Sequence, residues 1–179
     1  MSTSIKYHTI YPSEAIPEQY FSTRYDILRQ PIGMPIGSER LDDDHEAIHC
    51  YITLNNDIIA VGRIHLIPAG SDGAGKDHGG PGATAIPPFS PLVSDDGLHR
   101  PAVQIRQMGT RAEHRNNGYA KEILNRLEQE AQAHFNAKVG FLQAREIAIN
   151  FYEKSGWSII DEPYSIGEIG LHRSMMKQF

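Results

Sequence analysis

The order of apolar and polar residues changes its period several times along this chain. The clearest helical pattern covers residues 117–135, where apolar residues recur every three or four positions on one face. Short runs rich in β-forming residues flank it, and Gly156 follows a second helical stretch at the position of a C-terminal cap. From residue 101 onward, the pattern predicts helices over 117–135 and 146–154 and strands over 102–108, 138–142, 157–160 and 171–176.

The first part of the chain is predicted to contain a strand, a helix and a hairpin. Residues 5–10 form a short strand candidate, and residues 11–14 look like the start of a helix. Two runs of β-forming residues, 49–54 and 58–67, flank the turn sequence Asn55-Asn56-Asp57. This arrangement is typical of a β-hairpin.

The middle of the chain, residues 70–100, has a different composition. It contains seven glycines and four prolines and shows no periodic pattern. A range this long within a compact domain is expected to be a mobile flap or a loop at the edge of a site. Since no repeat or linker divides the 179 residues, we expect one domain, 1–179, with this loop inserted in it.

The charge and the cysteine content exclude several classes of protein. Lys and Arg number 17 against 22 Asp and Glu, which gives a net charge of -5 and argues against a nucleic-acid or membrane-surface binder. The longest clean apolar run, Ile58–Val61, is too short to cross a bilayer, and no targeting segment is visible. Cys50 is the single cysteine, so an internal disulfide is impossible and a cytoplasmic location is expected.

Two sequence patterns invite a metal or nucleotide site but lack the necessary context. His45-Glu46-Ala47-Ile48-His49 matches H-E-x-x-H, a zinc pattern that works only on a helix. Here it leads into a predicted strand, where the two histidines would lie roughly 13 Å apart, so no metal is expected. Residues 70–77 differ by one residue from a phosphate-binding loop. Asp77 replaces the required Ser or Thr and no helix follows, so a flexible glycine loop is the better interpretation.

A more complete phosphate-binding pattern lies between the predicted strand at 102–108 and the long helix. The sequence Arg115-Asn116-Asn117-Gly118-Tyr119-Ala120 places a glycine directly before the helix. Free backbone N–H groups and the helix dipole favour an anion there, and a small residue allows phosphate to approach. Arg115 adds a fixed positive charge. On this motif alone, an ordinary turn before a helix is an equally good interpretation.

A second block, the sequence AREIAINFYEKSGW at residues 144–157, changes the balance. The two blocks resemble the pyrophosphate-binding motif Q/R-x-x-G-x-G/A and the A-x-x-F-Y-E-K-x-G-F/W block of the GNAT superfamily of N-acetyltransferases. The resemblance is strong over residues 103–160, and residues 24–29 and 169–172 look like a bacterial branch with unassigned substrates. It implies an α+β fold: a single domain with a mixed, mostly antiparallel central sheet that is splayed at the coenzyme A site and flanked by helices.

The resemblance also implies a reaction and the residues that carry it out. Acetyl-CoA would give its acetyl group to a primary amine by direct attack in a ternary complex. Backbone groups of Met108 and Thr110 would contact the pantetheine arm, and residues 115–120 would hold the pyrophosphate. Tyr152 would protonate the leaving sulfur, since a phenol with a pKa near 10 can serve a thiolate with a pKa of about 8.5. The implied acetyl-CoA ligands are Met108, Gly109, Thr110, Arg115, Asn116, Asn117, Gly118, Tyr119, Ala120 and Arg145, the last standing where the family often has Asn.

Several points stay open at the level of sequence. The general base is not visible; the candidates are Glu46, His49, His65, His172 or a water molecule. A non-catalytic acyl-CoA-binding module and an acyl-homoserine-lactone-type acyltransferase are alternative functions of the same fold. The acceptor is expected to be a small-molecule or peptide amine, and the negative net charge slightly favours a cationic one. A homodimer is left open.

Overall fold

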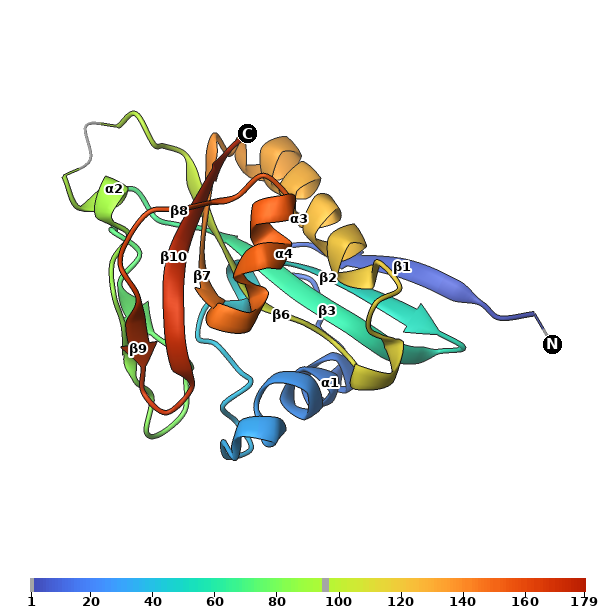
Figure 1. Ribbon diagram of the computed structural model, residues 1–179. Helices are drawn as coiled ribbons and strands as arrows, with labels where there is room; N and C mark the ends of the chain where they lie inside the picture. The colour runs from blue at the N-terminus through green and yellow to red at the C-terminus, as the bar shows by residue number, and fades with distance from the viewer. Residues whose placement is uncertain (1, 95–96) are drawn as a thin grey trace.

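The computed structural model describes residues 2–94 and 97–179. A mixed sheet forms its centre, with the strand order β1–β2–β3–β6–β7–β10–β8 and β9 paired to β10. Helices α3 and α4 lie on one side of this sheet and α1 on the other (Figure 1). The strands are β1 (Ile5–Ile10), β2 (Ile48–Leu54), β3 (Asp57–Leu66), β6 (Ala102–Thr110), β7 (Val139–Arg145), β8 (Ser158–Ile159), β9 (Tyr164–Ile166) and β10 (Gly170–Gln178).

The predicted α+β fold with a mostly antiparallel sheet is confirmed. β6 and β7 pair in parallel, and the other pairs of this sheet are antiparallel. The helices are α1 (Glu18–Leu28), α2 (Ser90–Val93), α3 (Tyr119–Phe135) and α4 (Ile149–Lys154). No helix in the described residues is both long and apolar enough to cross a membrane.

The start of the first helix differs from the prediction. The sequence places it at residues 11–14, whereas α1 begins at Glu18. Ser13 has a φ of 71°, a left-handed conformation that cannot continue a right-handed helix. Pro17 then occupies the N-cap position in an extended conformation and sets the true start.

The range 70–100 has more structure than a plain loop. It contains α2 and a small two-stranded sheet, formed by β4 (Gly75–Lys76) and β5 (Ala85–Ile86). Phe89 is fully buried and stacks on Phe141 of β7, with ring centroids 4.9 Å apart. The segment therefore packs against the α1 side of the sheet through apolar contacts, which the glycine and proline content did not indicate.

The sheet buries both of its faces, and neighbouring residues of β3 show how. Val61 packs with Tyr20 and Phe21 of α1. The next residue, Gly62, faces the opposite way, where an added Cβ would collide with Met108 and with Ile123 of α3. The largest core cluster lies on this second side, between α3, α4 and the central strands.

Candidate active site

The parallel pair at the centre of the sheet opens along its length. β6 and β7 are paired only from Ala102–Val139 to Ile105–Leu142, and their remaining residues diverge. The register of β6 against β3 shifts in the same region, where Gln107 has a φ of 58°. This bulge turns the end of β6 away from β7. The splayed sheet expected from the resemblance is therefore present.

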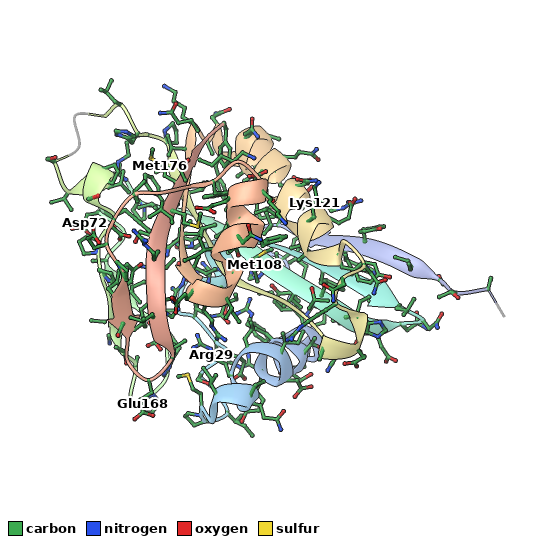
Figure 2. All side chains as sticks on the ribbon, viewed as in Figure 1. Arg29, Asp72, Met108, Lys121, Glu168 and Met176 are labelled. Atoms are coloured by element: carbon green, nitrogen blue, oxygen red, sulfur yellow. The ribbon has the colours of Figure 1, made fainter. Side chains whose placement is uncertain are left out.

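A cavity of about 620 Å³ lies at this opening and extends to the start of α3. It is lined by residues from both sides of the sheet: Met108 lies on the side of α3 and α4, and Arg29 beside α1 (Figure 2). The sequence-predicted site residues that line it are Met108, Gly109, Thr110, Arg115, Asn116, Gly118, Tyr119, Ala120, Arg145 and Tyr152.

Asn117 is the predicted site residue that does not line the cavity. Its side-chain amide donates to the carbonyl oxygens of His114 and Arg115, each at 3.1 Å. These bonds fix the turn before α3, so the Asn117 side chain shapes the turn instead of facing a ligand.

The turn before α3 has the geometry of an anion cradle. Gly118 is the N-cap residue with a φ of 80°, and Asn116 has a φ of 63°. An added Cβ at Gly118 would meet nothing within 4 Å, and Gly118 lines the cavity. The first backbone N–H groups of this 17-residue helix lack intrahelical acceptors and carry the positive end of its dipole. A phosphate is the group that such a site favours.

The opening between the strands suits the amide-containing arm of coenzyme A. Beyond Ile105 the edge of β6 that faces β7 has no strand partner, so its backbone groups can bond a ligand. The side-chain oxygens of Gln107 and Thr110 are buried without a hydrogen-bond partner, and both residues line the cavity. The Gln107 oxygen needs a donor such as an amide N–H, and the Thr110 hydroxyl can donate to an amide oxygen or accept from an amide N–H. The residues present therefore fit the cofactor.

Tyr152 lies deep in the same cavity, on α4. Its ring makes edge contacts with Phe151 and Trp157, with centroids 5.0 and 6.3 Å away, and burial raises the pKa of its hydroxyl well above the ordinary value of 10. The hydroxyl is a protonated donor that faces the cavity.

Among the candidates for a base, His172 of β10 lines this cavity. Its Nδ1 lies 2.8 Å from the carbonyl oxygen of Gly170. A carbonyl oxygen only accepts, so Nδ1 carries the proton and Nε2 keeps its lone pair. Burial, with a smaller contribution from the charge of Arg145, lowers the pKa of His172 below 6.5. The ring is therefore neutral near pH 7, as a base requires.

The other candidate bases lie elsewhere. His49 is fully buried and bonds Tyr20 through Nδ1 at 2.9 Å and the carbonyl oxygen of Asp44 through Nε2 at 2.7 Å. Both of its nitrogens are thus occupied within the core. Glu46 and His65 line a second, smaller cavity behind the first. His65 also lies 3.6 Å from Asp43, and burial lowers its pKa to about 3.

The H-E-x-x-H segment leads into β2 as predicted, but His45 and Glu46 belong to a short 3-10 turn (Asp44–Glu46) and not to the strand. His45 is 70% exposed while His49 is buried, so the two rings do not face a common point. Within residues 2–94 and 97–179, no group of three His, Cys, Asp or Glu side chains is placed to hold a metal ion.

Sequence reasoning missed one part of the cavity wall. Arg29, Asp77 and Ile86 line the cavity but come from the end of α1 and from the 70–100 range, far from both motifs. Gln104 and Arg106 of β6 line it as well. Arg29 lies in the 24–29 stretch and Asp77 in the 70–77 pattern, but neither pattern indicates that they share a cavity. Their proximity depends on contacts between distant segments.

Comparisons with known proteins agree with this geometry. A model of the acetyltransferase (GNAT) family matches residues 10–157, whereas no curated protein matches the chain significantly. An acyl-CoA N-acyltransferase from Pseudomonas aeruginosa shares the fold with a TM-score of 0.68 and 14% identity, over 97% of this chain and 99% of that one. Escherichia coli ElaA has a TM-score of 0.67 and 16% identity, over 98% of this chain and all of that one.

A third similar structure was solved with acetyl-CoA bound. It is a GNAT family acetyltransferase from Elizabethkingia anophelis, with a TM-score of 0.55 and 15% identity over 98% of each chain. At these identities the structures establish the fold, and the family match establishes the class. The chain belongs to the GNAT family of acetyltransferases.

Proposed function

We propose that the protein is an acetyl-CoA-dependent N-acetyltransferase that acetylates a primary amine in a ternary complex. One observation carries the proposal: a single cavity joins the N-terminus of α3, the opening between β6 and β7, Tyr152 and His172. Both substrates can therefore meet within the sheet. The cytoplasm remains the proposed location, since Cys50 is free and buried.

The two ends of the cavity serve different parts of the ligand in this proposal. Gly118 and the backbone N–H groups that follow it hold the pyrophosphate, and Arg115 adds a positive charge at the cavity rim. The unpaired edge of β6 at Met108–Thr110 bonds the pantetheine arm, as does the orphaned oxygen of Gln107. Acetyl-CoA supplies an acyl group activated as a thioester.

The reaction then requires two proton transfers, one from the amine and one to the sulfur. The reaction forms a bond from the acceptor nitrogen to the acetyl carbon and breaks the carbon–sulfur bond. Nε2 of His172 accepts the proton that the amine loses, because Nδ1 is already committed to Gly170. The Tyr152 hydroxyl donates a proton to the sulfur. Its raised pKa keeps it protonated until negative charge develops nearby.

A thermal-shift titration and a turnover assay test the proposal. The protein is titrated with acetyl-CoA, free CoA and ATP at constant magnesium, and stabilisation by the two CoA species alone is expected. Release of the CoA thiol is then followed with a panel of amines. Intersecting double-reciprocal plots support a ternary complex, whereas parallel plots indicate a covalent acyl-enzyme and contradict direct attack. CoA binding without turnover of any amine supports the non-catalytic alternative.

A further inference from the structure

The part of the cavity on the α1 side of the sheet is lined by long polar side chains from β6 and β7. Ile105 packs in the core on the α3 side, so its neighbours Gln104 and Arg106 face the other way. Arg145 of β7 donates through Nη2 to the carbonyl oxygen of Leu28, at the end of α1. These side chains lie across the sheet from the phosphate cradle.

This half of the cavity has an excess of positive charge. Arg29, Arg106 and Arg145 line it, and Asp77 is the one acidic residue among the described lining residues. Asp77 lies 3.9 Å from Arg29 and accepts a 2.6 Å bond from the backbone of Thr84. Neither Arg106 nor Arg145 has a carboxylate within 4 Å in residues 2–94 and 97–179.

Burial and neighbouring positive charges both lower the pKa values of these arginines. Burial lowers the pKa of Arg106 to about 9 and that of Arg29 to about 10, and neighbouring arginines add to the effect in both cases. Both groups remain protonated at pH 7. Asp43 and Asp77 offset the lowering of the pKa in part at Arg106, as Asp77 and Glu39 do at Arg29. A buried cation, Arg29, and the half-buried Arg106 beside a third arginine form a site that an anion stabilises.

The side-chain groups that lack hydrogen-bond partners on this side of the cavity are donors. Nε2 of Gln104 is buried without an acceptor in a side chain that is 2% exposed, and Nε of Arg29 is likewise unpartnered. The hydrogen bonds of Arg106 to described residues involve Nη2 alone, and so does that of Arg145. Donors therefore outnumber acceptors around this space, and a ligand with only acceptor oxygens would satisfy them.

From this arrangement we propose that the amine acceptor also carries a carboxylate, which Arg106 and Arg145 bind together with Gln104. The proposal rests on the acetyltransferase function and names the class of its acceptor: an amino acid or a similar amino carboxylate. His172 is paired with Arg145 across β10 and β7, so a carboxylate held at Arg145 brings the amino group toward Nε2 of His172. The charge of the cavity wall thereby outweighs the hint from the net charge, which favoured a cationic acceptor.

The coenzyme phosphates do not account for Arg106. The helix N-terminus that favours its phosphates lies at the start of α3, whereas Arg106 faces the other side of the sheet from its neighbour Ile105, which packs in the core beside α3. Arg106 also donates to the carbonyl oxygens of Lys76 and Asp77, at 3.1 and 2.9 Å, which ties it to the 70–100 range.

The test compares each acceptor with its own decarboxylated form. The twenty protein amino acids and their corresponding amines, such as L-phenylalanine and phenethylamine, are assayed for CoA release at saturating acetyl-CoA. The best amino acid is expected to exceed its amine at least 100-fold in kcat/KM. 2-Aminoethylphosphonate is assayed as an acceptor with a phosphonate in place of the carboxylate. A preference for it over every amino acid would overturn the assignment of a carboxylate.

Two arginine variants and a binding measurement test which residues recognise the carboxylate. Arg106→Gln and Arg145→Gln should each lower kcat/KM for that amino acid at least tenfold, and Arg106→Gln should leave the CoA-induced thermal shift unchanged. Arg40→Gln removes the same charge from an exposed pair with Glu18 and should change neither. In the absence of CoA, N-acetyl-L-phenylalanine should stabilise the wild-type protein more than N-acetylphenethylamine does.

The outcomes distinguish a failure of the carboxylate inference from a failure of the proposed acetyltransferase function. If CoA binds but no amino acid outperforms its own amine, the carboxylate inference is wrong and the proposed acetyltransferase function is judged on amine turnover alone. If CoA does not bind at all, both proposals fail. If the two variants behave like Arg40→Gln, these arginines do not recognise the acceptor.

Discussion

Substitution of Gly118 tests the phosphate cradle most directly. Gly118→Glu places a side chain and a negative charge in front of α3, where the glycine leaves space within 4 Å. The residue has a φ of 80°, so the substitution also costs about 1–2 kcal/mol of backbone strain. A control must therefore reproduce the strain without touching the cavity.

Gly82→Glu provides that control. Gly82 has a φ of 74°, has nothing within 4 Å of an added Cβ, and does not line the cavity. Both variants should lose a similar amount of stability. The entropy of unfolding for 179 residues is about 0.4 kcal/mol per kelvin, so strain of 1–2 kcal/mol lowers Tm by about 3–5 °C.

The ligand response should then distinguish the two variants. At a CoA concentration of about 100 times Kd, binding stabilises the protein by about 2.7 kcal/mol, which raises Tm by about 7 °C. Gly82→Glu should keep this shift, whereas Gly118→Glu should lose it. The assay is a thermal melt with and without CoA. A full 7 °C shift in Gly118→Glu would refute the assignment of the cradle.

Three further substitutions test the proton carriers and the buried ion pairs. Tyr152→Phe should lower kcat by about 10²–10⁴-fold in the turnover assay with an unchanged CoA shift, and a silent change would remove Tyr152 from the mechanism. His172 acts only when unprotonated, so kcat/KM should fall as the pH drops through its pKa, which lies below 6.5, and His172→Gln should abolish this acid limb. Asp44 binds Arg24 and Arg63 at 3.0 and 2.9 Å, and Asp44→Asn should cost about 3–5 kcal/mol in urea unfolding. These arginines hold the Asp44 pKa below 3.8, so the stability that ionised Asp44 gives the folded protein is present above that pH and is lost as the pH falls through the lowered pKa. If Asp44→Asn unfolds in acid at the same pH as the wild-type protein, this role is contradicted.

Local patterns predicted most elements correctly because their signals lie within a few residues. The period of α3 and the Asn55–Asp57 turn follow from spacing and from side-chain preferences. The glycine before α3 was recognised for the same reason. The prediction failed at Ser13, where a left-handed residue delays α1, and it missed β9, which has only three residues. Such short elements depend on pairing with a neighbour and have little pattern of their own.

The sequence by itself determined the family, the turn with its glycine before α3 and the placement of Tyr152 on a helix, since each depends on contiguous residues. Only the tertiary structure decided which histidine and which arginines share the cavity. His172 reaches it because β10 pairs with β7, and Arg29 because α1 packs beside β6. Contacts between segments so far apart in the chain are fixed by the burial of whole faces, which no single stretch of sequence encodes.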